Sequence, residues 1–130
     1  MLLNNLYQLM LFEANAEKSL NARIRLIKEH PIFEGHFPGN PILPGVCTVQ
    51  IVKELLEKLV NRELMLNKAG NIKYLGFINP MATAEVQFGL IISDSENGGI
   101  SCSATVTAGG NVVCSFKGEY FPLSSSHIQQ

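Results

Sequence analysis

The residues whose types and spacing could carry chemistry lie in one segment, from His36 to Val46. Between His30 and Gly45 the chain has four prolines and three glycines, so the backbone around His36 is tightly constrained. Histidine titrates near neutral pH, and its neutral form is a suitable base. Gly45 begins an expected helix, where a backbone N–H with the helix dipole behind it can bind a carbonyl oxygen. The segment therefore combines a base with an oxyanion donor, and such donors are worth roughly 3 to 4 kcal/mol.

The spacing of this segment resembles the signature of the β-hydroxyacyl-acyl-carrier-protein dehydratases, which have a hot-dog fold. The resemblance is sharp over residues 24–52 and looser, but collinear, over residues 71–121. It implies a (3R)-hydroxyacyl thioester dehydratase of fatty-acid or polyene-type biosynthesis, with His36 as the base and Gly45 as the carbonyl donor. The substrate would be carried on acyl carrier protein or coenzyme A, with no cofactor. Its expected contacts are Phe37, Pro38, Gly39, Pro44 and Val46.

One position departs from the resembled pattern. That family has an acidic residue fourteen positions after the histidine, facing the histidine of the opposite subunit, and this chain has Gln50 there. A neutral amide neither donates nor accepts a proton usefully near pH 7. Loss of a positioned acid typically lowers the rate by about 100- to 10,000-fold. We therefore expect Gln50 to be a water-holding or weakened stand-in for the catalytic acid.

Several alternatives follow from Gln50. Glu54, one turn further along the helix, or Glu34, in the loop, could replace the acid, although each is first interpreted as a solvated carboxylate. A partner subunit of related sequence could also supply it. The chain could instead be a catalytically weakened or inactive acyl-binding subunit of a heterodimer. Hydrolysis is a third possibility, because hot-dog domains also include acyl thioesterases.

The other histidines and the cysteines are interpreted structurally. His30 precedes a proline and His127 lies in the tail. Cys47 stands near the expected helix start, but a small apolar role is favoured over a nucleophilic one. The three cysteines have no metal-ligand spacing. Because the strand pattern places Cys114 opposite Val106, it lies about 13 Å from Cys102, too far for a disulfide.

The elements that must position these residues follow from periodicity. An amphipathic helix is predicted over residues 46–60. Alternating patterns predict strands over 20–26, 72–78, 86–92, 100–108 and 112–120, and residues 7–12 form a strand or one helical turn. A three-residue loop, 109–111, would join the last two strands. The prediction is an α+β hot-dog domain over residues 1–123, with about six antiparallel strands around one central helix, and a loose tail over 124–130.

Composition limits the partners. The chain has 130 residues, 46% of them apolar, and a net charge of −1. Without a basic block, no nucleic-acid partner is expected. So high an apolar content in a small chain predicts a second buried surface, in a homodimer or larger assembly or in a heterodimer with a related dehydratase. No stretch is typical of a signal peptide or a membrane span, so the expected location is cytoplasmic.

Overall fold

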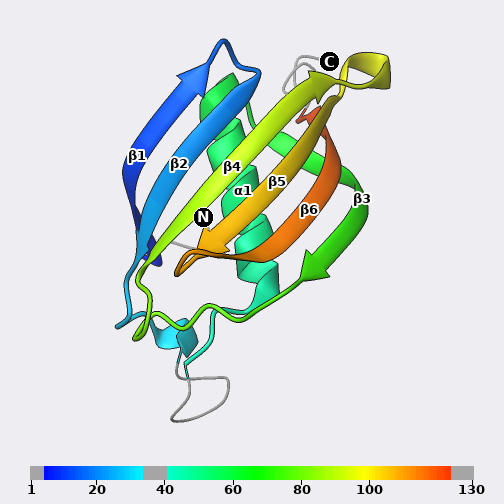
Figure 1. Cartoon of the computed structure of the whole chain (residues 1–130). Helices are drawn as coiled ribbons and strands as arrows, with labels where there is room; N and C mark the ends of the chain where they lie inside the picture. Colours follow the sequence, from blue (N-terminus) through cyan, green and yellow to red (C-terminus); the bar gives the residue numbers. More distant parts are fainter. Residues whose placement is uncertain (1–4, 34–40, 124–130) are drawn as a thin grey trace.

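The structure is a computed structural model that describes residues 5–33 and 41–123. Six strands and one long helix follow one another in the order β1, β2, α1, β3, β4, β5, β6 (Figure 1). Short 3-10 turns cover Pro31–Phe33 and Glu96–Gly98. The bounds of the main elements are β1 Tyr7–Asn15, β2 Ser19–Leu26, α1 Gly45–Val60, β3 Leu64–Tyr74, β4 Glu85–Asp94, β5 Ile100–Ala108 and β6 Asn111–Pro122.

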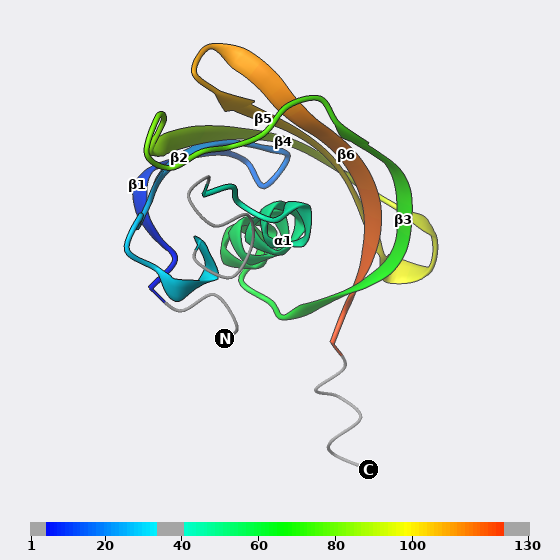
Figure 2. The same ribbon diagram turned by 90° about the horizontal axis from the view of Figure 1, so that it is seen from below.

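The strands form one sheet in the order β1-β2-β4-β5-β6-β3, and every neighbouring pair is antiparallel. Viewed along the helix, the sheet curves around α1 and leaves β1 and β3 as its two edges (Figure 2). The single helix buries the concave face of the sheet, as an antiparallel sheet with one apolar face requires. The predicted architecture, about six strands wrapped around one helix, is confirmed.

The core lies between α1 and the concave face of the sheet. On the apolar face of the predicted helix, Val52, Leu55, Leu56 and Leu59 are buried, whereas Val49 and Val60 are partly buried. The buried face of the helix is wider than the apolar face predicted from the sequence, because the curved sheet contacts the helix from several sides. It also includes Cys47, Thr48 and Ile51.

The hairpin between β5 and β6 corrects the predicted three-residue loop. Gly109 and Gly110 form a two-residue turn with φ values of 61° and 80°, the left-handed pair of a type I′ turn. The register then shifts, because Thr107 pairs with Val112 whereas Val106 pairs with Cys114. Val113 is thus an extra, buried residue, a β-bulge that brings the two apolar faces back together. The prediction that Cys114 lies opposite Val106 is confirmed, although a two-residue turn and a bulge produce this pairing instead of a three-residue loop.

The strand after the helix also differs from its prediction. It covers Leu64–Tyr74 instead of residues 72–78. Two register shifts against β6 interrupt its alternation, and most of its side chains are exposed at the sheet edge. After Tyr74 the chain leaves the ladder, and the N–H groups of Leu75 and Gly76 both donate to the Val113 carbonyl. In the described ranges, no helix has the length and apolar character needed to cross a membrane.

Candidate active site

The start of α1 is positioned by the chain that leaves β3. Pro44 is the N-cap, with extended φ and ψ of −60° and 142°, and Gly45 is the first helical residue. The Leu43 N–H donates to the Ile78 carbonyl at 2.9 Å and fixes this approach. A hollow of about 600 Å³ lies between the two segments, lined by Ile42, Leu43, Pro44, Gly45, Val46, Tyr74, Leu75, Gly76, Phe77 and Ile78. The hollow therefore contains three of the predicted site residues.

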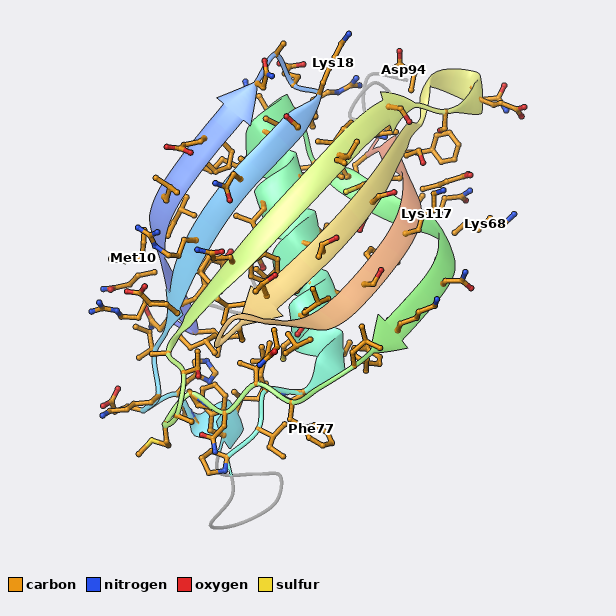
Figure 3. All side chains as sticks on the ribbon, in the orientation of Figure 1. Met10, Lys18, Lys68, Phe77, Asp94 and Lys117 are labelled. Atoms are coloured by element: carbon orange, nitrogen blue, oxygen red, sulfur yellow. The ribbon has the colours of Figure 1, made fainter. Side chains whose placement is uncertain are left out.

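The walls of this hollow are apolar and open. Val46 is 74% exposed and Phe77 is 79% exposed. Phe77 lies at the end of the molecule where α1 begins and points away from the sheet (Figure 3). Apolar side chains in such a position suit an acyl chain or a partner surface.

Gly45 is in contact with the ring of Tyr74. A Cβ built on Gly45 would lie 2.6 Å from a ring carbon of Tyr74 and 2.9 Å from its hydroxyl oxygen. A Cβ at position 45 would therefore require the ring of Tyr74, the far end of a half-exposed side chain, to shift. As the first residue of α1, Gly45 has an N–H with no acceptor inside the helix. Tyr74 is not among the predicted site residues, because nothing in its local pattern shows that β3 returns to the helix start.

Gln50 is part of a hydrogen-bonded set with Glu54 and Tyr7. The Gln50 Nε2 donates to Glu54 Oε2 at 3.1 Å, and the Tyr7 hydroxyl donates to Glu54 Oε1 at 2.6 Å. Burial, and then the neighbouring Glu54 carboxylate, raise the pKa of Tyr7, so the phenol keeps its proton and remains a donor. Glu54 is thus not the solvated carboxylate that was expected. Tyr7 was missed, because its partner is 47 positions away in the sequence.

A second hollow, of about 240 Å³, continues along the same face of α1. It is lined by Val49, Gln50, Lys53, Leu64, Met65, Leu66, Tyr120 and Leu123. Gln50 follows Val46 by one helical turn, so these two lining residues, one from each hollow, lie on the same face of α1. At the second one, the Tyr120 side chain is fully buried, and its hydroxyl has no hydrogen-bond partner within residues 5–33 and 41–123.

The remaining predicted residues divide into two groups. The positions of His36, Phe37, Pro38, Gly39, Glu34 and His127 lie outside the described residues. The three cysteines are free and buried, as expected. Burial raises the pKa of Cys102 to about 12 and also raises the pKa of Cys47, which argues against a nucleophilic thiolate at the helix start. His30 has a structural contact, since its Nδ1 accepts the Ile32 N–H at 3.0 Å.

The fold and the helix start define a hot-dog domain of the dehydratase class. The family model described as ApeI-like, ApeI dehydratase, matches residues 13–115. The chain belongs to the ApeI-like dehydratase family.

The sequence relatives are also described as dehydratases. The 3-hydroxyacyl-acyl-carrier-protein dehydratase FabZ of Rickettsia felis is 29% identical over 124 residues, which cover 85% of this chain and 83% of that relative. The FabZ of Novosphingobium aromaticivorans is 35% identical over 72 residues, which cover 52% of this chain but only 46% of that relative. The chain thus matches most of the length of one FabZ relative and about half of the other.

Solved structures confirm the fold. A chain of the dehydratase heterocomplex ApeI:P from Xenorhabdus doucetiae superposes with a TM-score of 0.75 at 16% identity, covering 88% of this chain and 97% of that one. A hypothetical thioesterase with coenzyme A from Streptococcus pneumoniae gives a TM-score of 0.64 at 12% identity, covering 90% and 85%. At these identities the likeness shows the hot-dog fold alone.

Proposed function

We propose that this protein is a (3R)-hydroxyacyl thioester dehydratase whose substrates are carried on acyl carrier protein or coenzyme A, in fatty-acid or polyene-type biosynthesis. The observation that supports this most is the family match over residues 13–115, which includes the motif from His36 to Gly45. The apolar hollow of about 600 Å³ at Gly45 suits the acyl thioester.

The proposed chemistry is the loss of water from the 3-hydroxyacyl chain. The Gly45 N–H would donate to the thioester carbonyl oxygen and stabilise the negative charge that develops there. Neutral His36 would remove the α-proton, the double bond would form between the α and β carbons, and the β C–O bond would break. The leaving hydroxyl takes up one proton to become water, either from the imidazolium of His36 that the first step forms or, in a heterodimer, from a carboxyl of the second subunit. Phe37, Pro38, Gly39, Pro44 and Val46 would contact the substrate.

Gln50 supports the alternative of an acyl-binding or heterodimeric subunit. In that case the second subunit, a related dehydratase, would supply the carboxyl that position 50 does not. The fold neighbour from Xenorhabdus doucetiae is itself described as a heterocomplex, so the arrangement has a precedent in this fold. The two alternatives differ in one property, which is whether the purified chain turns over its substrate alone.

The test is a purified-protein assay with 3-hydroxyacyl and acyl thioesters of acyl carrier protein, in which dehydration and hydrolysis are measured separately. We expect dehydration, read as enoyl product, and no accumulation of free acid. Free acid without enoyl product would instead identify a thioesterase. If neither product forms with the chain alone, but enoyl product forms after a related dehydratase is added, the subunit alternative is correct.

We also expect the protein to be at least a dimer in solution. β3 is an edge strand, and Met65, Tyr74, Leu75 and Phe77, on it or just beyond it, are between 51% and 79% exposed. Exposed apolar side chains along one sheet edge are typical of an interface. Sedimentation at micromolar concentration should give a mass of at least twice 14.3 kDa. A 14.3 kDa monomer alone would contradict both the dimer and any site shared between subunits.

A further inference from the structure

The Tyr74 hydroxyl is the one side-chain hydrogen-bonding group among the described residues that line the hollow of about 600 Å³. The other lining residues are aliphatic, glycine, proline or phenylalanine, so they make polar contacts only through their backbone. A ligand in a mostly apolar pocket is oriented by a small number of placed polar groups. Here those groups are the Tyr74 hydroxyl and the backbone at the start of α1, so their relative position decides what the hollow can bind.

The Tyr74 hydroxyl and the Gly45 N–H lie close together. The hydroxyl oxygen is 2.9 Å from the point where a Cβ of Gly45 would be, and a Cβ lies about 2.5 Å from the nitrogen of its own residue. The hydroxyl oxygen and the Gly45 nitrogen are therefore no more than about 5.4 Å apart. The Cα–Cβ direction of a helical residue leans towards the N-terminus, which is also where the first N–H groups point. Both groups thus lie on the N-terminal side of α1, next to the hollow.

This separation suits two donors that share one acceptor oxygen. A carbonyl oxygen has two lone pairs, roughly 120° apart, and donors bound to both at about 2.8 Å are about 5 Å from each other. Burial, and then the neighbouring Cys114, raise the pKa of Tyr74, so its phenol keeps the proton that it would donate. The Tyr74 side chain is 54% exposed, so a ligand in the hollow can reach it.

We propose that the Tyr74 hydroxyl is a second donor of the oxyanion site and, beside the Gly45 N–H, binds the carbonyl oxygen of the thioester. The identity of that ligand rests on the proposed function. A donor at this position stabilises the transition state more than the bound substrate, because the negative charge on the oxygen develops during the reaction. The phenol keeps its proton throughout, so the roles proposed for His36 and for the leaving hydroxyl do not change.

The first test is Tyr74→Phe, which removes the hydroxyl and keeps the ring. The value of kcat/KM for enoyl formation should fall about 10- to 100-fold, the effect of one hydrogen bond to a charged group. The affinity for hexanoyl pantetheine, a saturated thioester that cannot lose water, should fall less, by about threefold, because its carbonyl oxygen is neutral. Thr105→Val, which removes an exposed hydroxyl from β5, should change neither value.

Gly45→Ala provides an independent test of the contact. The new Cβ would lie 2.6 Å from a ring carbon of Tyr74, so the ring must move away, whereas the backbone N–H of residue 45 remains. In the Gly45→Ala background, Tyr74→Phe should therefore have no further effect on enoyl formation. Two residues that act independently would instead give additive losses, and additive losses would contradict the shared site.

The third measurement does not depend on turnover. Hexanoyl pantetheine, isotope-labelled at its carbonyl carbon, is bound to wild type and to Tyr74→Phe, and the carbonyl stretch is measured by difference infrared spectroscopy. The stretch should lie at a lower frequency in wild type, because each hydrogen bond weakens the C=O bond. Equal frequencies in the two proteins overturn the inference. It is also overturned if Tyr74→Phe keeps wild-type turnover and Tyr74→Leu raises it, since the ring would then only obstruct the hollow.

The proposed function can fail separately. If the stretch is lower in wild type than in Tyr74→Phe, but no enoyl product forms with the chain alone or with a related dehydratase, then Tyr74 binds the thioester carbonyl and the dehydratase activity is absent. If enoyl product forms and Tyr74→Phe changes neither turnover nor the stretch, the dehydratase activity stands and the second donor does not.

Discussion

Replacement of His36 by alanine should abolish dehydration while the fold remains intact. In the proposed mechanism this imidazole is the only base for the α-proton, and a positioned general base typically contributes about 100- to 10,000-fold. The described core is built from α1 and the strands, so a loop imidazole should add little to stability. Enoyl formation should fall to background, and the unfolding midpoint in urea should change little.

The matched control is His127→Ala, the same change in the C-terminal tail, which should keep wild-type turnover. Circular dichroism and sedimentation of both variants show whether the fold and the assembly are preserved. Wild-type turnover by a well-folded His36→Ala protein would remove His36 from the mechanism. Equal losses in both variants would point to a general effect on the protein.

The sequence could predict the architecture because its signals were local and mutually consistent. The alternation in β4, β5 and β6 and the periodicity of α1 each match one buried face of the structure. A sheet with one apolar face and a single amphipathic helix have only each other to pack against, so these patterns determine the fold class.

The errors occur where the backbone departs from regular pairing. Two arrangements of the residues between Ala108 and Cys114 produce the same pairing: a three-residue loop, or a two-residue glycine turn with a bulge at Val113. The sequence pattern does not distinguish between them. At β3, exposure and two register shifts remove the alternation that identifies a strand. Such irregularities depend on the neighbouring strand, which a local pattern does not contain.

The candidate site was predictable only where its residues are close in sequence. Pro44, Gly45 and Val46 lie in one motif, and they line one hollow. Tyr7 and Tyr74 come from distant strands and meet the helix only after the sheet has formed. Glu54 was recognised as an alternative acid, but its two hydrogen bonds could not be anticipated, because one donor is on β1.

We expect Gln50→Glu to raise dehydratase turnover by at least about tenfold, a fraction of the roughly 100- to 10,000-fold that a positioned general acid contributes. The two side chains are nearly isosteric, so the change in packing should be small. A carboxyl at position 50 can donate a proton to the leaving hydroxyl, whereas the amide oxygen can only accept one. The walls of the adjacent hollow include Val49, Leu66 and Tyr120, so desolvation should raise the pKa of the new carboxyl and favour its protonated form.

Glu54 should raise the pKa of the carboxyl in Gln50→Glu further. In wild type, Glu54 Oε2 lies 3.1 Å from the Gln50 nitrogen, so Gln50→Glu would bring two carboxyl groups together, and such a pair shares a proton. The double variant Gln50→Glu/Glu54→Gln separates the two causes, because the amide at position 54 would donate to the new carboxylate and lower its pKa. Turnover that depends on a protonated acid disappears as the pH rises through its pKa. The single variant should therefore remain active to a higher pH than the double variant.

The measurement is the pH dependence of enoyl formation by wild type, Gln50→Glu and the double variant. If wild type is already fast and Gln50→Glu slows it, another group supplies the proton, and Glu54→Gln and Glu34→Gln become the variants that identify it. If all three proteins are inactive alone, position 50 is not what limits the chain. A site that had become purely structural would have lost the surrounding geometry as well, and restoring one carboxyl would not restore turnover. An increase on Gln50→Glu would therefore indicate that the base, the carbonyl donor and the position of the substrate are intact, and that the missing acid alone limits the reaction.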